Sequence, residues 1–331
     1  MAGNVPVNFE MIAAAARRLE GHARRTPLLS SPFLDEIAGR RVFIKAECLQ
    51  HTGSFKFRGA WSAMTALPEA ARGVIAFSSG NHAQGVAYAA RLRGLPALII
   101  MPEDAPAVKI ANTRALGAEV RLYDRVTEDR DALGATLAQQ RGLELIQPFD
   151  HPQVIAGQGT TGLEIADQAR TEGIEDAQVL VCCGGGGLTS GIALALEHAA
   201  PKMLVRTVEP EGFDDVAQSL ATGQVVENPT RSGLCDAIVT PRPGTLTWPI
   251  LKRLCGPGLV VSDNDALRAM ALAHDRLKLV LEPGGAVALA AALFHPDQIE
   301  GAAVIVTASG GNVDRAVFLR ALAQGGADAD C

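Results

Sequence analysis

Short apolar runs alternate with alanine-rich, helix-like segments along most of the chain. The runs are apolar at consecutive positions, which is typical of strands buried on both faces of a sheet. They lie at residues 42–44, 73–77, 97–101, 119–123, 179–183, 203–208 and 302–307. Helices are predicted between them, for example at 83–93, 105–117 and 188–199. This alternation favours an α/β fold with mostly parallel sheets and helices on both faces.

The size of the chain favours two domains. It has 331 residues, of which 48% are hydrophobic and 20% charged, and this is enough for two domains of ordinary size. We predict one boundary after residue 71 and another near residue 150. Residues 72–149 would then form a small domain inserted into a large one made of 1–71 and 150–331.

Charge and composition exclude several classes of partner. The formal net charge is −6 and no long basic run occurs, which argues against a nucleic-acid partner. No apolar run reaches the roughly 18 residues that span a bilayer, and residues 1–4 lack a signal-peptide pattern. We therefore expect a cytoplasmic protein without a membrane partner. The six cysteines show no metal-ligand spacing, and Cys182 and Cys183 are expected to be buried thiols.

Lys56 lies between two aromatic residues, Phe55 and Phe57, just ahead of a predicted helix. Apolar neighbours disfavour the charged ammonium and lower the pKa of a lysine. A lysine that is less protonated can form a Schiff base with an aldehyde. Most lysines are solvated surface charges, so this interpretation depends on the motifs that accompany Lys56.

Four consecutive glycines, Gly184 to Gly187, follow a predicted strand and precede a predicted helix. Glycine allows a positive φ and brings backbone N–H groups close to an anion, and the helix dipole adds to the attraction. A phosphate is favoured over a plain tight turn. A dinucleotide is the rival ligand, but its glycine pattern fails at Thr189 and no acidic ribose partner follows at the expected distance.

Three polar loops follow other predicted strands. Residues 79–82 (Ser-Gly-Asn-His) open a helix whose N–H groups suit a substrate carboxylate, although Asn81 could simply cap that helix. Ser309 could bond a ring nitrogen or cap the last helix. Glu209, Asp214 and Asp215 suit a divalent cation or a helix cap. Lys56, the glycines and the polar loops together predict a pyridoxal-phosphate site.

These motifs resemble, in their order along the chain, those of the fold-type II pyridoxal-phosphate enzymes, whose fold is like that of the tryptophan synthase β subunit. The branch is that of the threonine/serine dehydratases and serine racemases, and the resemblance covers nearly the whole chain. It rests on Ser54–Ala60, Ser78–Gly85, Ile155–Thr160, Gly184–Gly187, Glu282-Pro283 and Ser309–Asp314.

The resemblance implies a role for each matching position. Lys56 would hold the cofactor and act with Ser79 as a catalytic residue. The other cofactor contacts would be Phe55, Asn81 (to the ring hydroxyl), Gly184, Gly185, Gly186, Gly187, Leu188, Glu282 and Ser309. The substrate would contact Ser78, Ser79, Gly80, Asn81, His82 and Arg130. Glu209, the backbone carbonyl of Phe213, and Asp215 would bind Mg²⁺ or Ca²⁺.

The implied activity is an ammonia-lyase reaction that converts a 3-hydroxy amino acid, such as L-threonine or L-serine, to a 2-oxo acid and ammonia. Ser79 replaces the alanine of many threonine dehydratases, as in the branch of serine racemase and threo-3-hydroxyaspartate dehydratase, so both stay open as alternatives. Because the sequence does not determine the substrate side chain, a dehydratase of a specialised catabolic pathway is a third alternative. Arg130 could then meet a second substrate carboxylate. A homodimer is also implied. A nicotinamide oxidoreductase and a ligand-binding module without turnover are alternatives from other classes.

Overall fold

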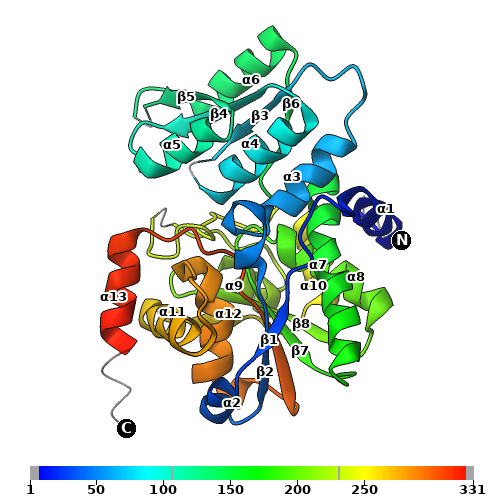
Figure 1. Cartoon of the computed structure of the whole chain (residues 1–331), viewed down its shortest axis with the longest axis vertical. Coiled ribbons are helices and arrows are strands. Elements are labelled where there is room, and N and C mark those ends of the chain that lie inside the picture. The colour runs from blue at the N-terminus through cyan, green and yellow to red at the C-terminus, as the bar shows by residue number, and fades with distance from the viewer. Residues whose placement is uncertain (1–6, 79, 106, 125, 230–231, 326–331) are drawn as a thin grey trace.

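A computed structural model describes residues 7–78, 80–105, 107–124, 126–229 and 232–325 of the chain. Its strands form two separate sheets (Figure 1). In chain order the strands are β1 (Leu28–Ser30), β2 (Arg41–Lys45), β3 (Val74–Phe77), β4 (Ala97–Pro102), β5 (Glu119–Tyr123), β6 (Glu144–Leu145), β7 (Gln178–Cys182), β8 (Leu204–Pro210), β9 (Leu259–Val261) and β10 (Ala303–Thr307).

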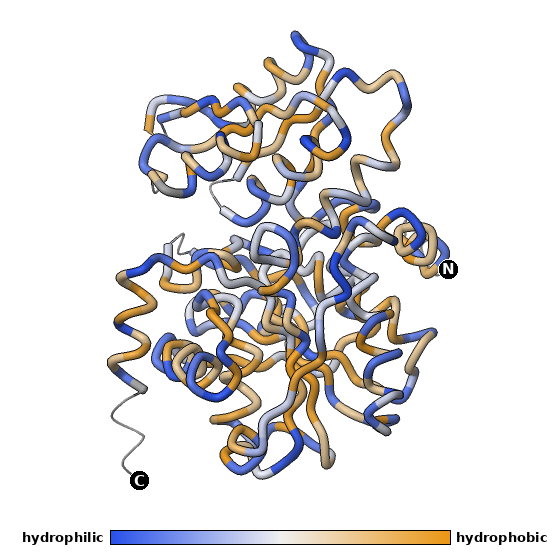
Figure 2. The backbone as a smooth tube through the Cα atoms, viewed as in Figure 1, coloured by the Kyte–Doolittle hydropathy of each residue, from blue (hydrophilic) through white to orange (hydrophobic). Residues whose placement is uncertain are grey.

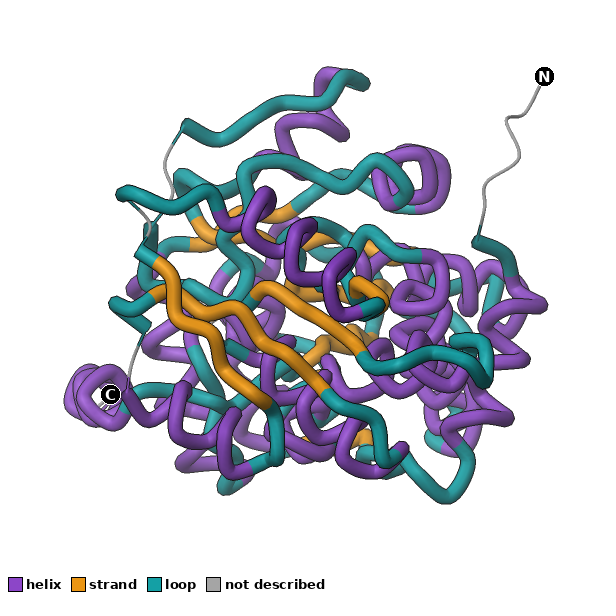
Figure 3. Tube along the Cα trace, turned by 90° about the horizontal axis from the view of Figure 1, so that it is seen from above, coloured by secondary structure: helices purple, strands orange, loops and turns teal. Residues whose placement is uncertain are grey.

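Helices surround both sheets, as the view from above shows (Figure 3). They are α1 (Phe9–Leu19), α2 (Pro32–Ala38), α3 (Lys56–Thr65), α4 (Asn81–Arg93), α5 (Ala107–Ala115), α6 (Arg130–Arg141), α7 (Pro152–Thr171), α8 (Gly187–Ala199), α9 (Asp215–Thr222), α10 (Thr247–Leu254), α11 (Asp263–Leu277), α12 (Pro283–Phe294) and α13 (Arg315–Gly325). Short 3-10 turns occupy Glu47–Leu49, His51–Gly53 and Pro296–Gln298. Of the helices described, none is long and apolar enough to cross a membrane.

The larger sheet has the strand order β1-β2-β10-β7-β8-β9, and every pair except β1–β2 is parallel. Alternate residues of its central strands face different helices. Val304 and Val306 pack with α12, whereas Ile305 packs with residues of α7 and α8. Both faces are therefore covered, which explains why residues 179–181 and 304–306 are apolar at consecutive positions. Figure 2 shows this sheet as mostly hydrophobic.

The smaller sheet has the order β5-β4-β3-β6 and is parallel throughout. Ile99 and Met101 of β4 pack in the core cluster that includes α4, while Leu98 and Ile100 pack in the cluster with residues of α6. All four strands of this sheet come from residues 74–145.

Helices α3, α4 and α7 connect the two sheets, because α3 packs against both other helices. Glycines allow their close approach. A Cβ atom at Gly157 of α7 would lie 2.5 Å from the carbonyl oxygen of Arg58, and one at Gly85 of α4 would lie 3.1 Å from the carbonyl carbon of Lys56. The motif glycines in α4 and α7 therefore serve to place α3, and with it Lys56, between the sheets.

Candidate active site

Lys56 is the first residue of α3, and its amine lies at the wall of a large cavity. The Nζ atom donates a hydrogen bond to the carbonyl oxygen of Pro148 at 2.9 Å and lies 5.1 Å from the centre of the Phe55 ring. Burial lowers the pKa of Lys56 to about 8, although the carboxyl group of Glu282 opposes the shift. The amine therefore reaches its uncharged, nucleophilic form at a much lower pH than an exposed lysine does.

The cavity beside Lys56 has a volume of about 760 Å³. Its lining includes Phe77 and Arg130 beside the smaller sheet, and Asp236 and Glu282 beside the larger one. It brings together seven of the residues predicted to form the site: Lys56, Ser78, Gly80, Asn81, His82, Arg130 and Glu282. Ser79 lies outside the described residues, so its predicted catalytic role is not placed by the structure.

The N-terminal end of α4 lies at this cavity. Gly80 occupies the cap position, Asn81 is the first helical residue, and the Ser78 hydroxyl accepts a hydrogen bond from the Gly80 backbone N–H at 3.1 Å. Backbone N–H groups in the first turn of a helix have no partner within the helix and lie at the positive end of its dipole. This end of α4 is suited to bind a carboxylate group.

Two basic side chains in the cavity differ in charge. The His82 ring nitrogen Nε2 lies 2.8 Å from the carbonyl oxygen of Ile146, and burial, with Lys56 adding to it, lowers the pKa of His82 to about 3. The ring is therefore neutral at physiological pH. The guanidinium of Arg130 lies over the Phe77 ring, 5.4 Å from its centre, and supplies a positive charge to the cavity wall.

The glycine run forms the turn between β7 and the N-terminus of α8, where Gly186 has a φ of 89°. The Phe149 side chain lies against this turn. A Cβ atom at Gly185 would lie 2.3 Å from the Phe149 ring, and one at Gly187 would lie 2.9 Å from the Phe149 Cβ. Phe149 lines the cavity, whereas the glycines are not among its lining residues, so the aromatic ring lies between the turn and the cavity.

Replacing Gly185 with alanine is expected to weaken cofactor binding, because the new methyl group would push Phe149 or the turn out of place. Overpacking of this kind costs about 1–3 kcal/mol. The part of this cost that the free protein relieves by relaxing, and the bound form does not, appears as a loss of affinity of up to about 150-fold. Titration of the apoprotein with cofactor would measure it. Gly256→Ala is the matched control, because its methyl group would meet the Leu204 and Arg206 side chains at 3.1 Å or more. Equal affinity of Gly185→Ala and Gly256→Ala would contradict the prediction.

Ser309 and Phe55 are distant in sequence but in contact in the fold. The carbonyl oxygen of Ser309 accepts a hydrogen bond from the Phe55 backbone N–H at 3.2 Å, and Phe55 packs against a cluster that contains Leu188. Ser309 does not cap a helix, since α13 begins six residues later at Arg315. Phe55 thus contacts Ser309 and the cluster that contains Leu188, and none of the three residues lines the cavity.

The candidate metal ligands lie apart from the cavity, at the end of β8 and the start of α9. The carboxylate of Glu209 accepts hydrogen bonds from the backbone N–H groups of Val216 and Ala217 at 3.1 and 2.7 Å, so it caps α9. Asp215 is bonded by Asn228, but its Oδ2 atom is buried without a hydrogen-bond partner. Burial raises the pKa of Asp215 to about 7 and, helped by Asp215, raises that of Glu209 well above its usual value. Among the described residues no group of three or more His, Cys, Asp and Glu side chains is placed to bind a metal.

The sequence analysis missed the segment from Pro148 to Asp150. Pro148 accepts the hydrogen bond of Lys56, and Phe149 covers the glycine turn. The Asp150 carboxylate accepts hydrogen bonds from the backbone N–H groups of residues 245, 246 and 247, where α10 begins. The nearby prolines indicated a boundary here, but nothing in the local pattern indicated contacts with three distant segments.

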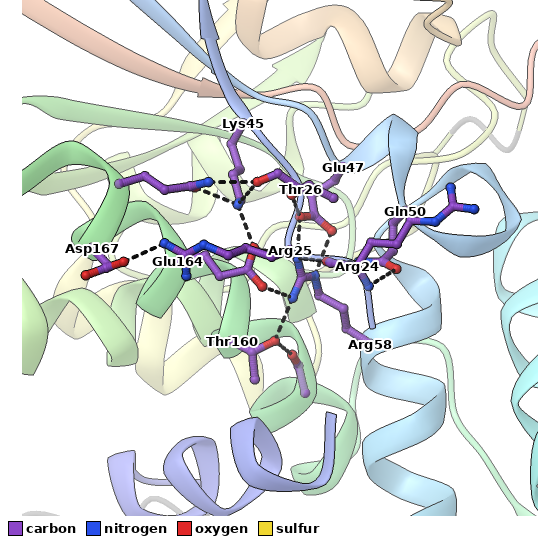
Figure 4. Close-up of polar contacts among 12 residues, drawn as sticks. Arg24, Arg25, Thr26, Lys45, Glu47, Gln50, Arg58, Thr160, Glu164 and Asp167 are labelled. Atoms are coloured by element: carbon purple, nitrogen blue, oxygen red, sulfur yellow. Dashed lines mark hydrogen bonds and ion pairs between the residues drawn. The ribbon is translucent and has the colours of Figure 1, made fainter. Parts of the chain in front are cut away.

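A buried ionic network surrounds the side chain of Arg58, two residues after Lys56 (Figure 4). The Arg58 guanidinium is 1% exposed and pairs with Glu47 at 2.8 Å and with Glu164 at 2.7 Å. The Lys45 amine pairs with Glu164 at 2.6 Å. Burial disfavours the charge on Glu47, but Arg58, Lys45 and a hydrogen bond from Thr26 outweigh it and lower the pKa of Glu47. Two positive and two negative charges therefore balance in the interior and tie α3 to β2 and α7.

The fold and the site define a fold-type II pyridoxal-phosphate enzyme, and comparison with known proteins agrees. The chain matches the family described as pyridoxal-phosphate dependent enzyme over residues 19–311, and it belongs to that family. It is 47% identical to an L-threo-3-hydroxyaspartate ammonia-lyase of Pseudomonas sp over 93% of this chain and 96% of the relative. It is 40% identical to a serine racemase of Schizosaccharomyces pombe over 96% and 97% of the two chains. Its structure is similar to a crystal structure of a threonine deaminase from T.th., with a TM-score of 0.88, 44% identity and coverage of 93% and 99%.

The residues present fit pyridoxal phosphate. Lys56 offers an amine of lowered pKa for the aldehyde. The glycine turn, in which Gly186 has a φ of 89°, leads into the N-terminus of α8, where a phosphate is favoured. When bound, this cofactor withdraws electrons from the substrate and stabilises negative charge at its Cα atom.

Proposed function

We propose that this protein eliminates ammonia from a 3-hydroxy amino acid. In the net reaction the substrate loses its β-hydroxyl and its Cα proton as water, water then adds, and ammonia leaves with a 2-oxo acid as the other product. The observation that carries the proposal is the position of the Lys56 amine, of lowered pKa, in the same cavity as the N-terminus of α4. A group that can hold the cofactor and move a proton thus lines the same cavity as a binding site for a carboxylate.

The cavity residues have separate tasks in this proposal. Lys56 holds the cofactor and takes the proton from the substrate Cα atom. The first-turn N–H groups of α4 bind the α-carboxylate and fix its orientation. His82, which is neutral and bonded to Ile146, packs the helix start and adds no charge to it.

We propose L-threo-3-hydroxyaspartate as the first substrate to test. The supporting observations are the 47% identity to a Pseudomonas enzyme of that name and the positive charge of Arg130 in the cavity wall, which suits a second carboxylate. Racemisation of serine is the second candidate, because a protein named serine racemase is 40% identical along almost its full length.

The test offers the purified holoenzyme L-threo-3-hydroxyaspartate, its erythro isomer, L-serine and L-threonine. Ammonia, 2-oxo acid and D-amino acid are measured in parallel. Oxo acid and ammonia in equal amounts, formed fastest from L-threo-3-hydroxyaspartate, are expected. D-Serine as the main product would show that the enzyme is a racemase and not a lyase. No release of ammonia from any of the four compounds would refute the proposal.

We also propose that Glu209, Asp215 and the Phe213 carbonyl bind Mg²⁺ or Ca²⁺. Both carboxyl groups have a raised pKa, so near neutral pH without metal Glu209 is largely protonated and Asp215 about half protonated, and protons must leave for metal to bind. The stabilisation by metal is therefore expected to increase as the pH rises through about 7. Melting temperatures with and without 1 mM of either ion at pH 6 and pH 8 measure this, on the assumption of roughly millimolar affinity or better. Asp215→Asn should lose the effect, and an equal shift in that variant would contradict the assignment.

Three further expectations are proposals of the same kind. A small domain of residues 72–149 within a large domain of 1–71 and 150–331 is supported by the origin of all four strands of the smaller sheet in residues 74–145. Homodimerisation and a cytoplasmic location rest on the resemblance and on the sequence. Light scattering of the purified protein would test the first of these two, and fractionation of cells the second.

A further inference from the structure

The amide of Asn81 is held on both sides by other side chains. Its Nδ2 atom donates a hydrogen bond to Glu282 Oε1 at 2.6 Å, and its Oδ1 atom accepts one from Asn312 Nδ2 at 2.7 Å. The Asn312 Nδ2 atom also donates to the backbone carbonyl of Thr52 at 2.7 Å. These contacts form a continuous chain from Thr52 through Asn312 and Asn81 to Glu282.

The ends of this chain determine the direction of every bond in it. A backbone carbonyl can only accept, so the nitrogen of the Asn312 amide must face Thr52. The same nitrogen then donates to the oxygen of Asn81, which turns the Asn81 nitrogen towards Glu282. The orientation of an amide side chain is often assigned and not observed. Here the Thr52 carbonyl at one end and the Glu282 carboxylate at the other are both acceptors, and both require the same orientation of Asn312 and Asn81.

The Asn81 nitrogen carries a second hydrogen that Glu282 does not use. Asn81 lines the cavity beside Lys56. Because its oxygen is engaged by Asn312, the group that Asn81 offers to the cavity is a hydrogen-bond donor.

Glycine at position 310 allows Glu282 to reach Asn81. A Cβ atom at Gly310 would lie 1.9 Å from Glu282 Oε1, and the Glu282 backbone N–H donates to the Gly310 carbonyl at 3.1 Å. The segment Ser309–Asn312 thus contributes both the space for Glu282 and the side chain that orients Asn81. Gly310 and Asn312 of the Ser309–Asn312 motif thus have structural roles, in addition to the cofactor contact assigned to Ser309.

We propose that Glu282 is a positioning residue that makes Asn81 a fixed hydrogen-bond donor to the ring hydroxyl of the cofactor. A donor stabilises the ionised form of that hydroxyl, so its proton moves to the nitrogen that joins the cofactor to Lys56. The inference rests on the proposed cofactor-dependent function and adds to it the residues that set the resting protonation state.

Glu282 is itself 3% exposed and faces several charged groups. They are Lys56 of α3, Lys109 of α5, and Asp236 in the loop before α10. Burial raises the pKa of Glu282 to about 7, while the hydrogen bond from Asn81 opposes the shift. As the pH rises through this range, Glu282 becomes a carboxylate and binds the Asn81 amide more strongly. The balance of the two cofactor forms should therefore depend on pH near neutrality.

The test is the visible absorbance of the resting holoenzyme, without substrate, between pH 6 and pH 9. In Glu282→Ala the ratio of the ionised to the neutral hydroxyl form should fall at least about tenfold, as for loss of one hydrogen bond to a charged oxygen. Glu282→Gln can still accept from Asn81 but cannot ionise. Its ratio should stay within the range that wild type spans between pH 6 and pH 9, without the pH dependence near 7.

Asp236→Asn is the matched control, because Asp236 also lines the cavity but pairs with Lys109 at 2.9 Å. At pH 9, where Glu282 is ionised in both proteins, it should leave the ratio of the two forms within about twofold of wild type. If Glu282→Ala does not fold, the double variant Glu282→Gln with Asn312→Ala removes both constraints on the direction of Asn81 and should lower the ratio instead.

A ratio unchanged in Glu282→Ala, or in the double variant where the single one does not fold, would overturn the inference. A ratio that falls as far in Asp236→Asn would overturn it as well. The proposed function fails by a separate outcome, in which wild-type protein binds no cofactor or releases no ammonia.

Discussion

Replacing Lys56 with alanine is expected to abolish both turnover and the visible absorbance of the lysine-linked cofactor. The amine lies in the cavity wall, where we propose that it holds the cofactor and moves the Cα proton. Loss of the general base alone costs about 10²–10⁴-fold in rate, and loss of the covalent link adds to this. Ammonia release and an absorbance spectrum of the same sample measure the two effects.

Lys109→Ala is the matched control for this variant. Lys109 also lines the cavity, but its amine is paired with Asp236. The absorbance should survive in Lys109→Ala. A Lys56→Ala protein that kept full activity would show that the cofactor and the proton depend on another group.

Replacing Arg58 with methionine is expected to lower the free energy of unfolding by about 3–5 kcal/mol, because removal of one partner leaves buried charges uncompensated. Glu47 and Glu164 would retain Lys45 as their cation, which leaves one negative charge in excess. Urea unfolding at pH 7 measures the effect, with cofactor occupancy held equal between the proteins.

The pH dependence of this loss follows from Glu47. Its pKa is lowered in the folded wild-type protein, so it contributes stability at neutral pH and loses that contribution as the pH falls below its unfolded pKa of about 4.5. The difference between Arg58→Met and wild type should therefore shrink in acid. Arg25→Met provides the comparison, because its pair with Asp167 is 55% exposed on both sides and should change stability by less than about 1 kcal/mol. Equal losses in Arg58→Met and Arg25→Met would contradict the role of burial.

The sequence predicted the family from motifs that occur in a fixed order along the chain. It predicted the α/β class and the long apolar strands because continuous apolar runs are strong local signals. β5 has the predicted bounds, Glu119–Tyr123. Three strands were missed, namely β1, β6 and β9, which have two or three residues each. Strands this short depend on pairing with neighbours that are already in place, and they carry little pattern of their own.

The site divides in the same way. Lys56 and the glycine turn belong to compact motifs that can be recognised locally. The bond from Asn81 to Glu282 joins residues 201 positions apart, and Arg58 meets Glu164 across 106 positions. Arg58 stood inside a recognised motif, yet its buried charge became evident only when the fold placed two carboxylates around it.

Helix α12 connects the packing of the hydrophobic core to the visible absorbance of the cofactor site. Residues 283–293 are all buried, and the helix begins immediately after Glu282. A change in its packing against β7, β8 or β10 would move Glu282 and, through Asn81, alter the colour of the bound cofactor. Cavity-forming substitutions deep in α12, such as Leu289→Ala, could then be followed in intact protein by their effect on the visible spectrum, even where the melting curve reports only the average stability of the whole molecule.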